Sequence, residues 1–65
     1  MLNHFSTNLR HYRKLRLMTQ QDLAEKLFIT RQTISTYETD TRRCDLDTLI
    51  RLSDILEISV DELIR

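Results

Sequence analysis

Two groups of apolar residues with different helical phases lie between residues 19 and 38. Each group falls on one face of a helix. The members are Leu23, Ala24 and Leu27 in the first group, and Ile34 and Tyr37 in the second. One unbroken helix cannot bury both groups. The stretch therefore predicts two short helices, at about residues 20–27 and 31–38, joined by a turn of about three residues.

Each of these two helices also begins with its own capping signal. Thr19 is followed three residues later by Asp22, which resembles a capping box, and Thr30 precedes a polar run that leads to Ile34. Two short helices joined by so short a turn match a helix-turn-helix motif, placed here at residues 19–38.

The length and composition indicate one small all-α domain. Sixty-five residues allow a single domain, residues 1–65, which buries only about 60% of its unfolded surface. The chain has no Gly, Pro or Trp, and its apolar residues are mostly Leu and Ile, which favours helix nearly throughout. So thin a core leaves no room for an enzyme cleft plus a scaffold, and we expect no enzyme and no catalytic residue.

Three more helices are predicted around the motif. Their expected bounds are about residue 4 or 6 to 16, about residue 46 or 47 to 56, and about residues 60–65. Asp45 resembles an N-cap for the second of them, and Ser59 with Glu62 resembles another capping box. Together the five helices predict a bundle.

Apolar residues at helical spacing are the candidates for the rest of the core. They are Phe5, Leu9, Tyr12, Leu15 or Leu17, Met18, Ile29, Leu46, Leu49, Leu52, Leu56, Ile58, Val60 and Leu63. The opposite side of the first helix is expected to carry Arg10, Lys14 and part of Arg13.

The formal net charge is zero, but the charges are divided along the chain. Residues 1–43 hold eight Lys and Arg against four Asp and Glu, a net charge of +4, while residues 44–65 hold two against six, a net charge of −4. A polyanion would be steered to the N-terminal two-thirds of the chain. A chance scatter of charges over solvated faces is the alternative.

Membrane, disulfide and metal chemistry find no support in the sequence. No apolar run approaches the roughly 18 residues of a membrane span, and residues 1–10 lack the apolar region of a signal peptide, so we expect a cytoplasmic protein. Cys44 is alone, which predicts a surface thiol without a disulfide or a Cys-based zinc site. His4 and His11 have no partner ligands nearby, so we expect no metal and no cofactor.

The second helix of the motif carries side chains that can read DNA bases. Its expected exposed face is Arg31, Gln32, Thr33, Ser35 and Thr36. In the major groove, Arg can pair with guanine, Gln can pair with adenine, and Thr can hydrogen-bond or touch a thymine methyl group. No carboxylate lies among them. An ordinary solvated helix surface is the alternative.

Gln20 stands in the first turn of the preceding helix, where free N–H groups and the helix dipole favour a phosphate oxygen. Its amide is expected to contact the DNA backbone and to brace Gln32.

The stretch from Leu9 to Leu63 resembles a known family through several spaced motifs. They are L-R-x-x-R, T-Q-x-x-L-A, T-R-x-T-I-S-x-Y-E, L-x-x-L and I-S-x-x-E-L, in chain order. In these it is similar to the small DNA-binding domain of phage repressors and Cro proteins, the XRE-type helix-turn-helix family. The resemblance implies five helices and a dimer bound to two DNA half-sites.

The resemblance also implies roles for individual residues. Base readers are Arg31, Gln32 and Thr36, with support from Thr33 and Ser35 and an edge contact from Gln20. Phosphate contacts are Arg13, Thr19, Gln20, Arg42 and Arg43. Arg13 is further implied to pair with Glu38, which would neutralise and orient its guanidinium. Arg42 and Arg43 have an alternative role, which is to balance the acidic C-terminal half.

Four positions depart from the family pattern. Leu17, Phe28 and Asp40 stand where the family often has Gly, and Cys44 stands where it often has Pro. A positive φ at Phe28 would cost on the order of 1 kcal/mol or more. We hypothesise that its ring compensates by covering apolar surface at the turn. At Asp40 the cost of a positive φ is expected to be smaller than at Phe28, because Asp tolerates the left-handed region.

Leftover apolar residues in the C-terminal region predict a dimer interface. Ile50, Ile55 and Ile64, with Leu2 as a further candidate, exceed what a thin core can hold. A twofold dimer through this region would place two recognition helices about 34 Å apart, one turn of B-DNA.

These features predict a sequence-specific DNA-binding transcriptional regulator, a repressor that is associated with the nucleoid when bound to DNA. Activation uses the same fold. The alternative is a protein-interaction module, such as an antitoxin, whose main partner is a protein. No small-molecule effector and no membrane partner are expected.

Overall fold

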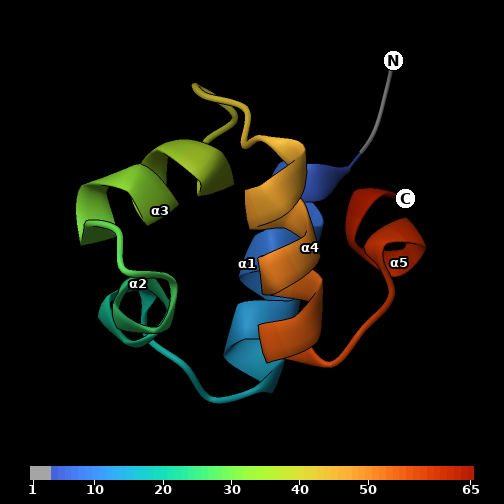
Figure 1. The fold of residues 1–65 in the computed structure, drawn as a ribbon, viewed down its shortest axis with the longest axis horizontal. Helices are drawn as coiled ribbons and strands as arrows, with labels where there is room; N and C mark the ends of the chain where they lie inside the picture. The colour runs from blue at the N-terminus through green and yellow to red at the C-terminus, as the bar shows by residue number, and fades with distance from the viewer. Residues whose placement is uncertain (1–3) are drawn as a thin grey trace.

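The computed structural model describes residues 4–65 and consists of five helices within that range. They are α1 (Phe5–Leu15), α2 (Gln20–Leu27), α3 (Arg31–Glu38), α4 (Leu46–Leu56) and α5 (Val60–Ile64). In Figure 1, α1 and α4 lie in the middle, with α2 and α3 on one side and α5 on the other. The predicted all-α bundle is confirmed, and α2 and α3 have the predicted bounds. Leu2 lies outside the described residues.

Both predicted capping boxes are present. Thr19 Oγ1 accepts from the backbone N–H of Asp22 at 3.0 Å, and Asp22 Oδ2 accepts from the N–H of Thr19 at 2.9 Å. Ser59 and Glu62 make the same reciprocal pair at the start of α5, with both distances 3.0 Å. These bonds satisfy N–H groups that have no partner inside the helix, which is why such short helices begin where they do.

The other two predicted N-caps are also confirmed. Thr30 Oγ1 accepts from Thr33 N at 3.1 Å, and Asp45 Oδ1 accepts from Thr48 N at 3.3 Å. Hydrogen bonds with Thr48 lower the pKa of Asp45, and hydrogen bonds with Thr19 lower the pKa of Asp22. Each carboxylate is therefore favoured in its charged form by the folded state.

A residue with positive φ follows each of α1, α2, α3 and α4 within two residues of the helix end. These residues are Leu17, Phe28, Asp40 and Glu57, with φ between 59° and 61°. After each, the next N–H reaches a carbonyl five residues back, for instance Ile29 N to Ala24 O at 3.0 Å. This is the bond of a Schellman motif, which normally uses Gly at the left-handed position. The positive φ expected at Phe28 and the left-handed Asp40 are confirmed, whereas Glu57 was not foreseen.

Phe28 is 86% exposed, so the expectation that its ring covers apolar surface at the turn is wrong. Leu17 is likewise 91% exposed. Their backbone strain is offset by the hydrogen bonds of the turn and not by burial of the side chains.

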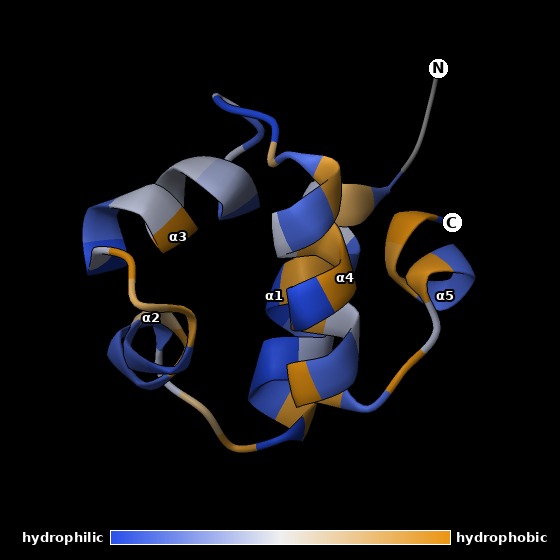
Figure 2. Cartoon of the chain, in the orientation of Figure 1, coloured by the Kyte–Doolittle hydropathy of each residue, from blue (hydrophilic) through white to orange (hydrophobic). Residues whose placement is uncertain are grey.

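The core is built from side chains of all five helices, and in Figure 2 hydrophobic (orange) and hydrophilic (blue) segments alternate along α1 and α4. Its buried members are Phe5, Leu9, Leu23, Ala24, Leu27, Ile34, Tyr37, Leu52, Leu56 and Leu63. Packed against them and partly buried are Tyr12, Met18, Ile29, Cys44, Leu49, Ile55 and Ile58. Leu15 and Leu46 were expected in the core but are 60% and 67% exposed, because each lies at a helix end that no other element covers. Arg13, expected partly at the surface, is buried.

Two side chains of the α1 region bind the open carbonyls at the ends of later helices. Asn8 Nδ2 donates to Leu63 O at 3.0 Å and to Glu62 O at 3.2 Å. Arg16 Nε donates to Leu56 O at 2.8 Å, at the end of α4. These bonds fix α5 and α4 against α1, and they supply partners that the last turn of a helix lacks.

We predict that the cap carboxylates make stability depend on pH. Because their folded pKa values lie below the ordinary 3.8, their charge stabilises the fold above that pH, and the benefit is lost as the pH falls through the folded values. Asp22→Asn combined with Asp45→Asn should lower Tm at pH 6, and the gap to the parent should close at pH values well below 3.8. Thermal unfolding followed by circular dichroism measures this. Asp54→Asn, within α4, is the control, and a gap that is independent of pH would contradict the prediction.

We predict that Phe28→Gly stabilises the domain. Gly removes the steric cost of the left-handed backbone, and the exposed ring contributes little, so the free energy of unfolding should rise by about 1 kcal/mol. Urea denaturation gives the value. Phe28→Ala keeps the Cβ but removes the ring, and should change stability by less than about 0.5 kcal/mol. A large loss in Phe28→Ala would show that the ring packs against the fold after all.

Candidate nucleic-acid interface

Helix α3 presents its polar side chains away from the core. Ile34 is fully buried and Tyr37 is buried, while Arg31 and Gln32 are exposed. The remaining predicted base readers, Thr33, Ser35 and Thr36, are half-buried. Helix α3 (Figure 1) therefore carries two long, exposed polar side chains in its first turn.

Hydroxyl groups on this helix are partly engaged by the protein itself. Thr36 Oγ1 donates to Thr33 O at 2.7 Å, and the hydroxyls of Thr30 and Thr33 lie 2.9 Å apart. The hydroxyl proton of Thr36 is therefore engaged within the helix, and its oxygen keeps the capacity to accept a hydrogen bond.

The predicted pair of Arg13 with Glu38 is confirmed and is buried. Nε of Arg13 donates to Oε2 of Glu38 at 2.6 Å, and Nη2 donates to Oε1 at 3.1 Å. Nη1 of Arg13 donates to the carbonyl of Met18 at 2.8 Å, which ties in the loop between α1 and α2. The side chains of Arg13 and Glu38 are 9% and 1% exposed. Whether Arg13 also faces a phosphate stays a prediction.

Gln20 connects this buried pair to the surface. Its Nε2 donates to Oε1 of Glu38 at 3.1 Å, and its Oε1 accepts from Nη1 of Arg31 at 3.2 Å. The expected brace between Gln20 and Gln32 is thus replaced by one between Gln20 and Arg31.

Arg10 belongs to the same cluster, although the sequence did not single it out for this face. Its Nε lies 3.9 Å from Oε1 of Glu38, and its side chain is 59% exposed. Arg10 precedes Arg13 by three residues on α1, so their shared side of the helix was the signal available in the sequence. Arg10 and Arg13 both face the carboxylate of Glu38, and Arg31 is linked to it through Gln20, which leaves an excess of positive charge in this cluster.

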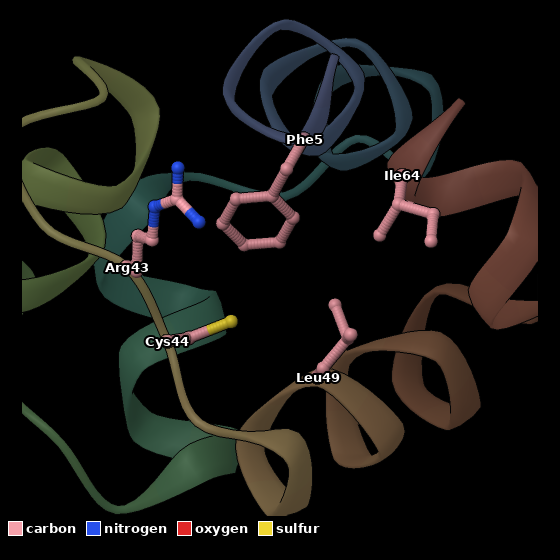
Figure 3. Close-up of a pocket in the computed structure, with 5 residues that line it drawn as sticks. All are labelled: Phe5, Arg43, Cys44, Leu49 and Ile64. Atoms are coloured by element: carbon pink, nitrogen blue, oxygen red, sulfur yellow. The ribbon is translucent and has the colours of Figure 1, made fainter. Parts of the chain in front are cut away.

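The loop between α3 and α4 holds the other predicted phosphate contacts, Arg42 and Arg43, both exposed. The side chain of Arg43 lies at the edge of a hollow of about 130 Å³ that it lines with Phe5, Cys44, Leu49 and Ile64 (Figure 3).

Cys44 lines the same hollow and points its sulfur into it (Figure 3). It is a free cysteine, as predicted, but it is half-buried and not fully at the surface, and burial raises the pKa of its thiol. The remaining predicted phosphate contact, Thr19, is exposed at the start of α2, where its hydroxyl oxygen serves as the cap.

The predicted interface residues differ in exposure. Ile50 is 43% exposed on α4, and Leu46 lies one turn before it and is 67% exposed. Ile55 and Ile64 are half-buried, and Ile55 packs against the core. The exposed apolar surface of this region is therefore centred on the first half of α4.

Within residues 4–65, no three His, Cys, Asp or Glu side chains are grouped so as to hold a metal ion. None of the helices in that range combines the length and apolar character needed to cross a membrane.

Comparison with known sequences gives consistent matches. A family model described as Helix-turn-helix matches residues 9–63. YqaE of Bacillus subtilis (strain 168), named an uncharacterized HTH-type transcriptional regulator, is 46% identical over 61 residues. The match covers 94% of this chain and 53% of YqaE, so the chain spans about half the length of that relative.

Solved structures share the fold. A transcriptional regulator from Listeria innocua matches with a TM-score of 0.91 and 28% identity, over 98% of this chain and 60% of that one. The restriction-modification controller protein C.AhdI from Aeromonas hydrophila matches with a TM-score of 0.84 and 27% identity, over 91% and 89%. Hydroxypropylphosphonic acid epoxidase from S. wedmorenis matches with a TM-score of 0.86 and 26% identity, over 94% of this chain but 32% of the enzyme.

The family model spans most of the 65 residues, and the matched range includes the capped pair α2 and α3. The chain therefore belongs to the helix-turn-helix family, of the XRE type.

Proposed function

We propose that this chain is a sequence-specific DNA-binding transcriptional regulator, a repressor that binds a pseudo-palindromic operator as a dimer. The observation that carries the proposal is the exposed N-terminal end of α3, where Arg31 and Gln32 project with no carboxylate among their neighbours on that face. The names of the relatives and structural neighbours, which include several transcriptional regulators, support it.

In the proposed complex, α3 lies in the major groove. Arg31 would donate two hydrogen bonds to a guanine, and Gln32 would pair with an adenine. The half-buried side chains of α3 would touch only those base edges that lie close to the helix; they are Thr33, Ser35 and Thr36. Such a reader of chromosomal or phage DNA would act in the cytoplasm, at the nucleoid.

Phosphate contacts would flank the groove on both sides of α3. Thr19 and Gln20 stand at the N-terminus of α2, where backbone N–H groups favour an anion. Arg42 and Arg43 extend from the loop after α3. To this predicted set, which also includes Arg13, we add Arg10, because its guanidinium is largely exposed beside Glu38.

A protein partner is the second candidate function. Leu17 and Phe28 are 91% and 86% exposed, and large apolar side chains so exposed favour a protein contact. Fluorescence anisotropy with a random duplex at two salt concentrations separates the two functions. If the chain neutralises phosphates, its affinity for the duplex should fall steeply as the salt concentration rises. A module that binds only protein would show no association with the duplex at either concentration.

We predict that Arg31→Ala relaxes sequence preference at one base pair. The loss of a bidentate contact should cost roughly 1–3 kcal/mol at that position and little elsewhere. Selection of bound duplexes from a random pool, followed by binding titrations, measures it. Arg51→Ala removes an exposed arginine from α4 and serves as the control. An equal loss of affinity on every duplex would reassign Arg31 to a phosphate.

We predict that Ile50→Glu weakens both self-association and operator binding. A charge placed within the exposed apolar surface of α4 opposes its burial against a second copy, and loss of the dimer separates the two half-site contacts. Sedimentation equilibrium and operator titration measure the two effects. Leu15→Glu, at a more exposed apolar position on α1, should leave self-association unchanged. A parent protein that is monomeric at high micromolar concentration would refute the proposed dimer.

A further inference from the structure

Four side chains form one continuous line of hydrogen bonds from the core to the surface of α3. Arg13 donates to Glu38 at 2.6 and 3.1 Å, Gln20 donates to Glu38 at 3.1 Å, and Arg31 donates to Gln20 at 3.2 Å. The line runs through α1, α3 and α2 and returns to α3. Its inner end is buried and its outer end is exposed.

Chemistry permits the amide of Gln20 only one orientation in this line. The carboxylate of Glu38 can only accept hydrogen bonds, and the guanidinium of Arg31 can only donate them. The NH₂ group of Gln20 must therefore face Glu38 and its carbonyl must face Arg31. A flipped amide would set acceptor against acceptor and donor against donor.

The orientation is imposed from the core. The side chain of Glu38 is 1% exposed and is held by two hydrogen bonds from Arg13, so it cannot turn away from Gln20. Gln20 in turn presents a fixed acceptor to Arg31, which is otherwise an exposed and flexible side chain. The conformation of Arg31 is thus restricted before any ligand is bound.

We propose that Glu38 is a specificity-determining residue, which acts through Gln20 to hold Arg31 and does not itself touch DNA. This rests on the proposed function, in which Arg31 reads a base. A guanidinium that is already oriented loses less rotamer freedom on binding and directs its donors at one geometry. Orientation therefore increases discrimination at one base pair more than it increases general affinity.

Two variants interrupt the line at different points. Glu38→Gln lets the amide of Gln20 flip, but it also leaves Arg13 buried without its countercharge, which can unfold so small a domain. Gln20→Met keeps the side-chain length, removes both amide bonds and leaves the pair of Arg13 and Glu38 intact. Gln21→Met is the matched control, because the amide of Gln21 bonds Glu25 within α2, at 3.1 Å.

The first measurement is made on the free protein. Nuclear magnetic resonance relaxation of the Nε–H group of Arg31 reports the order of its side chain, and does not depend on DNA binding. Gln20→Met, and Glu38→Gln if it folds, should lower that order, whereas Gln21→Met should not. An Arg31 side chain that is equally mobile in the parent and in Gln20→Met overturns the proposal.

The second measurement is the base preference of each variant, obtained by selection from a random pool. Gln20→Met should reduce discrimination roughly three- to tenfold at the base pair assigned to Arg31, and should have no such effect when Arg31→Ala is already present. If Gln20→Met reduces discrimination equally in the parent and in Arg31→Ala, the proposal is overturned, because Gln20 would then act on that base pair without Arg31.

The variants distinguish a failure of the role of Glu38 from a failure of the proposed function. If Arg31→Ala relaxes one base pair and Gln20→Met does not, the role of Glu38 is wrong and the proposed function stands. If Arg31→Ala changes no base preference, then Arg31 does not read a base, and both are overturned.

Discussion

A buried ion pair between Arg13 and Glu38 holds α3 against α1. Its two partners come from α1 and α3, and Arg13 also bonds the carbonyl of Met18 in the loop that leads to α2. Removing one partner of such a pair leaves an uncompensated buried charge, at a cost of about 3–5 kcal/mol. Replacing both by apolar residues can cost little, so the pair matters less for total stability than for fixing where α3 lies.

Tight helix ends without glycine are the second constraint on the fold. The chain has no Gly, yet Leu17, Phe28, Asp40 and Glu57 all adopt positive φ. The bond that follows each one closes the helix end, and it offsets the steric cost of the side chain. Exposure of Leu17 and Phe28 shows that backbone geometry, not packing, determines these turns.

Local signals made much of the fold predictable. Capping residues such as Thr19 and Asp45 act within four residues, and the periodicity of α2 and α3 appears within two turns, so both can be read from neighbouring positions. Leu46 was misplaced because periodicity gives the apolar face of α4 but not how far the neighbouring helices extend over it. The same limit applies to Cys44, whose partial burial comes from packing against the core that the other helices build.

The sequence by itself determined the helices, their caps, and the exposed polar face that carries Arg31 and Gln32. Its likeness to a family supplied the pair of Arg13 and Glu38, which lie 25 residues apart. Only the tertiary structure decided that Gln20 bonds Glu38, 18 residues away, and that it holds Arg31 rather than Gln32. The reason is physical: caps and periods depend on neighbours along the chain, whereas the direction of an amide depends on charges brought together by packing.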